Sequence, residues 1–488
     1  MKLIHLLLLS LLSITAPAQL FRCVVAVDGS GTHLTVQEAI NACPDNEASI
    51  IYIKNGRYEE QVTIGTKAAP STKILSIIGE HPDSVIITAN NARNSTNGLS
   101  YEQVVTFQVY ASDFYMEGIT IENTAGNTGM AEALYTGADR QTFKNCIIRS
   151  YQDTYRSKKG TRAYFDNCII EGAVDFIYAG GVIFFDNCTI RCIGNSGYIT
   201  APEDAAFTIP RLQTSVDKFL RLGFIFRDCT ITAAPGVPNN SFYLGRPWNS
   251  TAGSFYLNCK LGEHINPKGW KEWNGNESSA SFAEYNSTDL NGNPVDLSQR
   301  VSWSFQLPKA DVDNLFTTTA IYARVSTSNS YDPETLVKAP AAPASLSVNG
   351  SLLNWSEVEG AVAYLILKNN NLLGTTTELS FTDTNPQQGS YTVRAVGARG
   401  QQSIAAGVSA LQNPSFECEI RQFADKIHIS TPVQARMYTS SGQLMYNSSG
   451  TTDVIAIGGF SEGTYLLQLT DQNSATVTKK LRITTTTH

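Results

Sequence analysis

One six-residue pattern recurs through the middle of the chain and constrains its fold more than any other feature. It reads aromatic residue, any residue, Asn or Asp, Cys, any residue, and then Ile or Leu. The copies begin at Phe143, Phe165, Phe185, Phe226 and Tyr256. A period of roughly 20 residues with such fixed positions is typical of a solenoid of stacked repeats. The regular leucines of leucine-rich repeats are missing, so the pattern predicts an all-β fold whose main domain is a right-handed parallel β-helix.

Two acidic residues occupy equivalent places in consecutive copies of this repeat. Asp153 and Asp175 each follow their repeat cysteine, Cys146 or Cys168, by seven residues. If each copy is one coil of the helix, the two residues lie one strand spacing apart, about 4.8 Å. Two carboxyl groups at that distance cannot both ionise readily, so they can share a proton. The spacing therefore predicts a pair of acids suited to acid and base chemistry.

The repeat also bears on the nine cysteines of the chain, five of which occupy the repeat position. Side chains at that position are expected to point into the core, which favours buried thiols that pack as small apolar groups. Two disulfides remain open alternatives, between Cys168 and Cys188 on neighbouring coils and between Cys23 and Cys43. The odd count leaves at least one thiol unpaired, and Cys418 is the candidate.

Charge and motif content exclude several classes of function. The net charge of −7 and the pI near 5.5 argue against a nucleic-acid partner. The six histidines are scattered, with none at metal-ligand spacing, and no serine-hydrolase elbow is present. No metal or other cofactor is therefore expected. The chemistry is expected to come from carboxylates.

The chain divides by composition into five segments. Lys2, the apolar run Leu3–Ile14 and the small residues before Gln19 have the form of a secretory signal peptide. No later stretch reaches the ~18 apolar residues that a membrane span needs, so a secreted protein is expected, extracellular or attached to the cell surface. The predicted segments are a signal peptide at 1–18, a β-helix domain at 19–325, a linker at 326–343 and small β-sandwiches at 344–412 and 413–488.

The two C-terminal segments resemble known modules. Residues 344–412 carry short alternating strands with Trp355 early and Tyr391 late, which resembles a fibronectin type III domain. A spacer role is predicted, and carbohydrate binding remains an alternative. Residues 413–488 are similar to the C-terminal sorting domain of type IX secretion, which implies the outer-membrane secretion machinery as a partner. A second small sandwich without a sorting role is the alternative.

Several motifs within residues 24–290 together resemble the pectin methylesterase family. They begin at Val25 (VAVDGSG), Gly56 (GRYEE), Tyr151 (YQDT), Gly172 (GAVDFI), Tyr243 (YLGRPW) and Gly269 (GWKEW). The family is a right-handed parallel β-helix, in agreement with the repeat. The resemblance implies an ester hydrolase that removes methyl groups from the galacturonate residues of pectin (homogalacturonan). A solenoid with capped ends needs no partner subunit, so a monomer is expected.

The resemblance also implies roles for individual residues. Asp175 is the expected nucleophile, and Asp153 is the expected acid that then acts as base. Arg246 is expected to bind Asp175 and lower its pKa, which leaves Asp153 as the protonated member of the pair. Gln152 is expected to donate its amide to the oxyanion. The expected substrate contacts are Trp248, Tyr155, Phe176 and Met130.

Two departures from the family motifs concern the same region. Met130-Ala-Glu132-Ala-Leu stands where the family has Gln-Ala-Val-Ala-Leu, so an oxyanion amide is missing. Losing one such donor can lower turnover by ~10²–10³. Either Gln152 with a backbone N–H suffices, or Glu132 or another group substitutes, or the activity is reduced or redirected. The family's Gln-Asp-Thr-Leu-Tyr is here Gln152-Asp-Thr-Tyr155-Arg156, and Tyr155 is expected to stand in for the missing aromatic residue.

Two other classes of function remain open at this point. One is another pectin-active β-helix enzyme, either a lyase, which would want a calcium-binding acidic cluster, or a glycosidase, whose carboxyl groups lie ~5–10 Å apart. The other is a non-catalytic solenoid that binds pectin, which the replacement at Met130 and the appended modules encourage.

Overall fold

The computed structural model describes residues 21–209, 220–325, 329–386, 389–410, 420–423, 425–440, 443–471 and 476–483. The predicted signal peptide and Cys418 lie outside these ranges. The chain divides into two compact units, the first made of residues 1–342, 358–365 and 394–404 and the second of the remainder. None of the described helices is long and apolar enough to cross a membrane.

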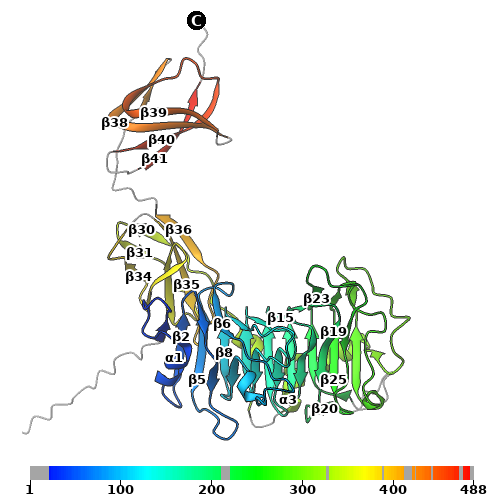
Figure 1. The fold of residues 1–488 in the computed structure, drawn as a ribbon. Coiled ribbons are helices and arrows are strands. Elements are labelled where there is room, and N and C mark those ends of the chain that lie inside the picture. The colour runs from blue at the N-terminus through cyan, green and yellow to red at the C-terminus, as the bar shows by residue number, and fades with distance from the viewer. Residues whose placement is uncertain are drawn as a thin grey trace, which may run out of the picture. The chain divides into compact units, whose positions relative to one another are not determined.

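Three long parallel sheets make up most of the first unit, and their strands follow one another coil by coil along the chain (Figure 1). Sheet 1 contains β1 (Phe21–Val25), β2 (Ala48–Ile53), β5 (Ile74–Gly79), β8 (Phe114–Glu117), β11 (Gln141–Lys144), β14 (Arg162–Asp166), β17 (Val182–Asp186), β22 (Phe224–Arg227), β25 (Gly253–Leu257), β27 (Ser281–Tyr285) and β29 (Phe305–Gln306). Sheet 2 contains β3 (Gly56–Glu59), β6 (Val85–Ala89), β9 (Thr120–Asn123), β12 (Ile147–Arg149), β15 (Ile169–Gly172), β18 (Thr189–Cys192), β23 (Thr230–Ala233), β26 (Lys260–Leu261) and β28 (Thr288–Asp289). Sheet 3 contains β4 (Val62–Ile64), β7 (Phe107–Val109), β10 (Leu134–Thr136), β13 (Tyr155–Ser157), β16 (Val174–Ala179), β19 (Gly197–Pro202) and β24 (Phe242–Gly245). The predicted parallel β-helix is confirmed.

The aromatic position of the repeat forms a continuous stack inside the helix. Neighbouring rings from Phe143 through Phe165, Phe185 and Phe226 to Tyr256 lie 4.4–4.9 Å apart between centroids and within 16° of parallel. The spacing equals the separation of adjacent strands, because each ring belongs to one coil of sheet 1. All five side chains are fully buried. The stack therefore fixes the register of successive coils.

The Asn or Asp position of the repeat turns the chain from sheet 1 into sheet 2. Asn145, Asn167 and Asn258 have φ between 50° and 53°, in the left-handed region that Asn tolerates better than most residues. The Asn167 amide donates to Asn145 Oδ1 at 2.7 Å, so the amides pair between adjacent coils. One residue later, the buried thiols stack, and the Cys146 N–H donates to Cys168 Sγ at 3.4 Å.

All eight cysteines in the described ranges are free and buried. The interpretation of the repeat cysteines as buried thiols is confirmed. The alternative disulfides, Cys168 with Cys188 and Cys23 with Cys43, are wrong. On adjacent coils each thiol hydrogen-bonds to backbone groups instead, as Cys188 Sγ does with the Cys168 N–H and the Phe165 carbonyl.

Shorter elements complete the first unit. They are α1 (Val36–Ala42), the 3₁₀ helices η1 (Glu102–Val104) and η2 (Asn276–Ser278), the antiparallel pair β20 (Thr208–Ile209) and β21 (Leu220–Arg221), α2 (Lys309–Leu315), α3 (Thr318–Val325) and α4 (Pro333–Leu336). Helix α1 begins at a capping box, in which Thr35 accepts from the Glu38 N–H and Glu38 reaches back to the Thr35 N–H.

The segment 326–343, predicted as a linker, packs against the β-helix over its described part. Tyr331 is buried, and its hydroxyl donates to the Gln141 carbonyl at 2.9 Å. Lys144 Nζ donates to the Val337 carbonyl at 2.7 Å, and Glu334 pairs with Arg227. The linker stays a prediction. Its described part is packed because apolar residues such as Leu336 and Val337 cover the outer face of sheet 1.

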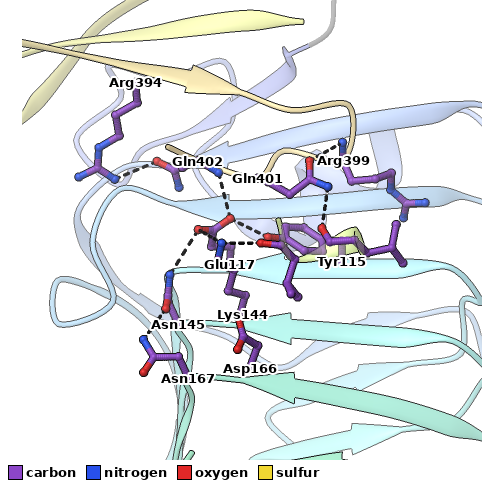
Figure 2. Close-up of polar contacts among 12 residues, drawn as sticks. Tyr115, Glu117, Lys144, Asn145, Asp166, Asn167, Arg394, Arg399, Gln401 and Gln402 are labelled. Atoms are coloured by element: carbon purple, nitrogen blue, oxygen red, sulfur yellow. Dashed lines mark hydrogen bonds and ion pairs between the residues drawn. The ribbon is translucent and has the colours of Figure 1, made fainter. Parts of the chain in front are cut away.

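A second segment, Arg394–Ile404, lies on the same outer face (Figure 2). The Gln402 N–H donates to Glu117 Oε2 at 3.2 Å, and the Tyr115 hydroxyl donates to the same oxygen at 2.7 Å. Arg399 donates to the Asp113 carbonyl and to Ser76 Oγ. Burial raises the pKa of Glu117, although Lys144 and Tyr115 oppose the shift. A buried carboxylate with several donors therefore anchors this segment to sheet 1.

The remaining strands form antiparallel sheets. Residues 347–410 contain a three-stranded sheet of β30 (Ser347–Asn349), β31 (Leu352–Asn354) and β34 (Ser380–Thr382), and a four-stranded sheet of β33 (Asn371–Thr376), β32 (Ala363–Lys368), β35 (Gly389–Val396) and β36 (Ala406–Ala410). Residues 420–483 form one five-stranded sheet of β37 (Ile420–Gln422), β38 (Lys426–Thr439), β39 (Leu444–Ala456), β40 (Gly463–Thr470) and β41 (Thr476–Ile483). The resemblances of these segments to a fibronectin type III module and to a sorting domain stay predictions.

The central ring of the aromatic stack provides a test of how coil register is maintained. We expect Phe185→Ala to lower the free energy of unfolding by about 3–5 kcal/mol, because it removes two stacked contacts and leaves a cavity. If filled apolar volume maintains the register, Phe185→Leu should lower the free energy of unfolding by about 1.5 kcal/mol or less. Urea denaturation followed by tryptophan fluorescence measures both. Equal losses in the two variants would show that ring stacking, and not filled volume, holds the coils.

Candidate active site

The predicted acids lie on adjacent coils of sheet 3. Gln152 pairs with Val174 in a parallel bridge, and Tyr155 pairs with Ile177 further along the same two strands. Asp153 and Asp175 therefore occupy equivalent positions, and the Asp153 N–H donates to the Val174 carbonyl at 3.1 Å. This register follows from the repeat, because Asp153 and Asp175 each follow their repeat cysteine by seven residues.

Both aspartates interrupt the regular alternation of their strands. Asp153 has φ 63° and Asp175 has φ 47°, and the pairing of β16 with β19 shifts register between Val174 and Ile177. Asp tolerates this left-handed region better than most residues. Beyond each interruption, Tyr155 and Phe176 are fully buried in the apolar core, whereas Asp153 and Asp175 are 5% and 8% exposed.

Asp175 is held by a two-point ion pair with Arg246, which directly follows β24. Arg246 Nε lies 2.9 Å from Asp175 Oδ1, and Nη2 lies 2.5 Å from Oδ2. The guanidinium is sandwiched between two rings, 3.9 Å from the centroid of Tyr198 and 4.0 Å from that of Trp273. Such a fork fixes both the position and the orientation of the carboxylate.

The pKa values of both acids are raised. Burial raises the pKa of Asp175, and Arg246 opposes this shift through its hydrogen bonds and its charge. Arg246 thus limits the increase without bringing the pKa below its usual value, contrary to the simple expectation of a lowered pKa. Burial, Asp175 and Glu132 together raise the pKa of Asp153 to about 8. Asp153 is therefore the member of the pair that carries a proton at neutral pH.

Gln152 lies next to Asp153, and Trp248 lies against Tyr178, on the strand that contains Asp175. The Gln152 side chain is half-buried and hydrogen-bonds to Asp153. Trp248, two residues after Arg246, is 44% exposed, and its ring lies 6.0 Å from that of Tyr178. Met130 is half-buried and pairs with Arg93 in an antiparallel bridge. All three remain candidates for contacts with a substrate.

Two of the predicted substrate contacts are wrong. Tyr155 and Phe176 are both fully buried in the core of the β-helix. The Tyr155 hydroxyl hydrogen-bonds to Thr136 Oγ1 at 2.8 Å, and its ring packs edge-on against Phe165. Sequence proximity to the aspartates was misleading because the left-handed backbone at each Asp directs the following residues inward.

The structure also excludes Glu132 as a substitute for the missing oxyanion amide. Glu132 has no exposed surface, and both of its oxygens are engaged by the side chains of Arg156 and Tyr178. It therefore cannot donate to a group bound outside the core. Tyr198 and Trp273, which hold Arg246, were not predicted as site residues. The sequence gives only a weak signal for them, since Trp273 belongs to the GWKEW motif and Tyr198 to no motif.

The family model described as Pectinesterase matches residues 22–322. The chain belongs to the pectinesterase family. The probable pectinesterase/pectinesterase inhibitor 6 of Arabidopsis thaliana is 34% identical over 296 residues, which cover 59% of this chain and 49% of the relative. The probable pectinesterase A of Aspergillus niger is 32% identical over 295 residues, which cover 59% of this chain and 84% of the relative. The chain thus spans about half the length of the plant relatives that it matches.

Solved structures in the pectinesterase family give the same result for the fold. The pectin methylesterase from carrot is 28% identical with a TM-score of 0.54, over 63% of this chain and 95% of the carrot chain. The pectin methylesterase from Aspergillus niger is 31% identical with a TM-score of 0.50, over 60% of this chain and 92% of that chain. The right-handed parallel β-helix is confirmed.

The raised pKa of Asp153 predicts how stability depends on pH. Between the usual pKa of an aspartate and about 8, the folded state binds more protons than the unfolded state, so stability falls as pH rises through this range. The loss is complete above about pH 8. We expect Asp153→Asn, which cannot ionise, to melt several degrees higher than the parent protein at pH 9 and to show a much smaller difference at pH 5. Thermal melts at both pH values measure this, and equal differences would contradict it.

Proposed function

We propose that this chain is a secreted carboxylic ester hydrolase that removes methyl esters from the galacturonate residues of pectin. The observation that carries the proposal is the pair Asp153 and Asp175 on adjacent coils, with Arg246 bound to only one of them. One acid is thereby held as a charged, aimed carboxylate, and its neighbour stays neutral. This division is what nucleophilic attack with proton donation requires.

The reaction proceeds in two halves. Asp175 attacks the C6 carbonyl carbon of a methyl-esterified galacturonate and forms a tetrahedral intermediate. Asp153 protonates the departing methoxy oxygen, so methanol leaves and an acyl-enzyme forms. Asp153, now ionised, takes a proton from water, and the resulting hydroxide attacks the acyl carbon. Asp175 is released as a carboxylate and Asp153 is protonated again, while the product leaves as a galacturonic acid group that gives its proton to solvent.

Binding and charge stabilisation are assigned to neighbouring side chains. The Gln152 amide donates to the oxyanion of each tetrahedral intermediate, which forms beside Asp153. The exposed face of Trp248 stacks on a sugar ring of the polymer. The scheme uses only side chains of this chain.

The finer features of localisation are part of the same proposal. The resemblance of residues 1–18 to a signal peptide supports export from the cytoplasm, and residues 413–488 would engage an outer-membrane secretion machinery. The module at 344–412 serves as a spacer, and the chain acts as a monomer on its polysaccharide. The assignments of export, secretion and spacer rest on sequence resemblance, and that of a monomer rests on the capped ends of the solenoid.

Methanol release from esterified pectin tests the proposed reaction. We expect the parent protein to release methanol and both Asp175→Asn and Asp153→Asn to lose at least about 10³-fold in kcat, because the amides cannot act as nucleophile or acid. Circular dichroism serves as the check on folding. Retained activity in Asp175→Asn would reject the nucleophile, and shortened polymer chains without methanol would indicate a lyase or glycosidase.

Restoring the missing amide tests the assignment of the oxyanion site. We expect Met130→Gln to raise kcat by about tenfold or more with little change in KM, because a new donor stabilises only the charged intermediate. Met130→Leu, which keeps an apolar side chain of similar size, is the matched control and should leave kcat within about twofold. A rise in the Leu variant, or none in the Gln variant, would place the oxyanion elsewhere.

A further inference from the structure

A third carboxylate lies beside the two aspartates and has no part in the proposed reaction. Glu132 precedes β10 and is fully buried. Arg156 Nε donates to Glu132 Oε2 at 2.8 Å, and the Tyr178 hydroxyl donates to Oε1 at 2.6 Å. A buried ion pair is unfavourable unless its remaining hydrogen bonds are satisfied. Here each carboxylate oxygen has a donor, whereas Arg156 Nη2 is buried without a hydrogen-bond partner. An apolar residue such as the family's Val would avoid this requirement altogether.

The partners of Glu132 lie on β13, which begins two residues after Asp153, and on β16, which contains Asp175. Arg156 lies on β13, three residues after Asp153, and Tyr178 lies on β16, three residues after Asp175. Arg156 and Tyr178 are paired neighbours in sheet 3. By bonding to both side chains, Glu132 joins the two strands directly alongside the acid pair.

The main chain and a neighbouring ring hold this group in place. The Glu132 carbonyl accepts from the Thr106 N–H at 3.0 Å and from the Asn123 amide at 3.2 Å. The Arg156 guanidinium lies 4.0 Å from the centroid of the Tyr135 ring. Tyr135 is the residue of β10 that pairs with Arg156 of β13 in the sheet. The position of the charges relative to Asp153 is therefore fixed by sheet 3 and not by a mobile loop.

The charges of Glu132 and Arg156 act on Asp153 in opposite directions. Glu132 disfavours the ionised form of Asp153 and so raises its pKa, whereas Arg156 lowers it. Burial raises the pKa of Glu132 itself to about 7, and Arg156 and Tyr178 oppose that shift. The titratable or charged groups that bear on Asp153 or Glu132 are Asp175, Arg156, Tyr178 and Glu102.

We propose that Glu132 is a positioning residue for the acid Asp153, because its carboxylate binds Arg156 and Tyr178, joins strands β13 and β16, and balances the Arg156 charge beside Asp153. This inference rests on the proposed esterase function. Without Glu132, the Arg156 cation would act on Asp153 unopposed and favour its ionised form. Asp153 would then lack the proton that the departing methoxy group needs.

The test is the pH dependence of kcat/KM for methanol release, which reports ionisations of the free enzyme. Glu132→Gln keeps the size of the side chain and one acceptor oxygen, which can still accept from Arg156 Nε, and removes the charge. The other oxygen becomes an NH₂ group that can donate to the Tyr178 hydroxyl. We expect the alkaline limb of the profile, on which Asp153 loses its proton, to move to lower pH by about one unit. Removing one nearby charge changes a pKa by an amount of this size. A merely structural role would lower activity equally at every pH.

Two further variants sharpen the result. Glu132→Val combined with Arg156→Tyr removes both charges together and installs the residues of the family motifs, so its alkaline limb should stay close to that of the parent protein. Glu117→Gln is the matched control, because Glu117 is also a buried carboxylate that accepts from a tyrosine but lies on sheet 1. Its profile should not move.

The possible outcomes separate this inference from the proposed function. If the parent protein releases no methanol, the proposed function fails. If it does, and folded Glu132→Gln keeps the parent profile or the double variant shifts as far as the single one, the inference about Glu132 is overturned. Should Glu132→Gln not fold, Tyr178→Phe removes one bond to Glu132 and should give a smaller shift in the same direction, and an unchanged profile there would also overturn it.

Discussion

The coil-to-coil register of the β-helix is the constraint on which the site depends. The stacked rings from Phe143 to Tyr256 fix this register inside the core, and equivalent residues on adjacent coils must then lie one strand spacing apart. Asp153 and Asp175 are such a pair. Their proximity is therefore a property of the whole solenoid, and the local residues only decide how the resulting like-charge repulsion is relieved.

The repulsion is relieved differently at the two aspartates because their surroundings differ. Arg246 arrives from β24, two coils beyond Asp175 in sheet 3, and its guanidinium is clamped between Tyr198 and Trp273. It binds Asp175 through Nε and Nη2, so Asp175 can hold a charge although it is buried. Asp153 faces like charges and low solvent access, which favour its neutral form.

Much of the fold and the central acids could be predicted from the sequence, because the repeat places Asp153 and Asp175 in the same register whatever surrounds them. The contacts at Tyr155 and Phe176 could not, since the left-handed backbone at each Asp reverses the direction of the residues that follow. Glu132 and Arg156 are visible as two separate departures from family motifs. Only the structure shows that they bind each other, because they lie on different coils.

The same construction occurs twice around Asp153. Asp175 with Arg246 and Glu132 with Arg156 are each a buried carboxylate bound by a guanidinium that packs on aromatic rings. When Glu132 is ionised, each pair is neutral overall, so the surroundings of Asp153 are balanced only while Asp153 itself is uncharged. Ionising it adds one unpaired negative charge to a poorly solvated site, which is why its proton is retained until alkaline pH. A reaction that transfers this proton to a leaving group and regains it from water restores the balanced state at the end of every cycle.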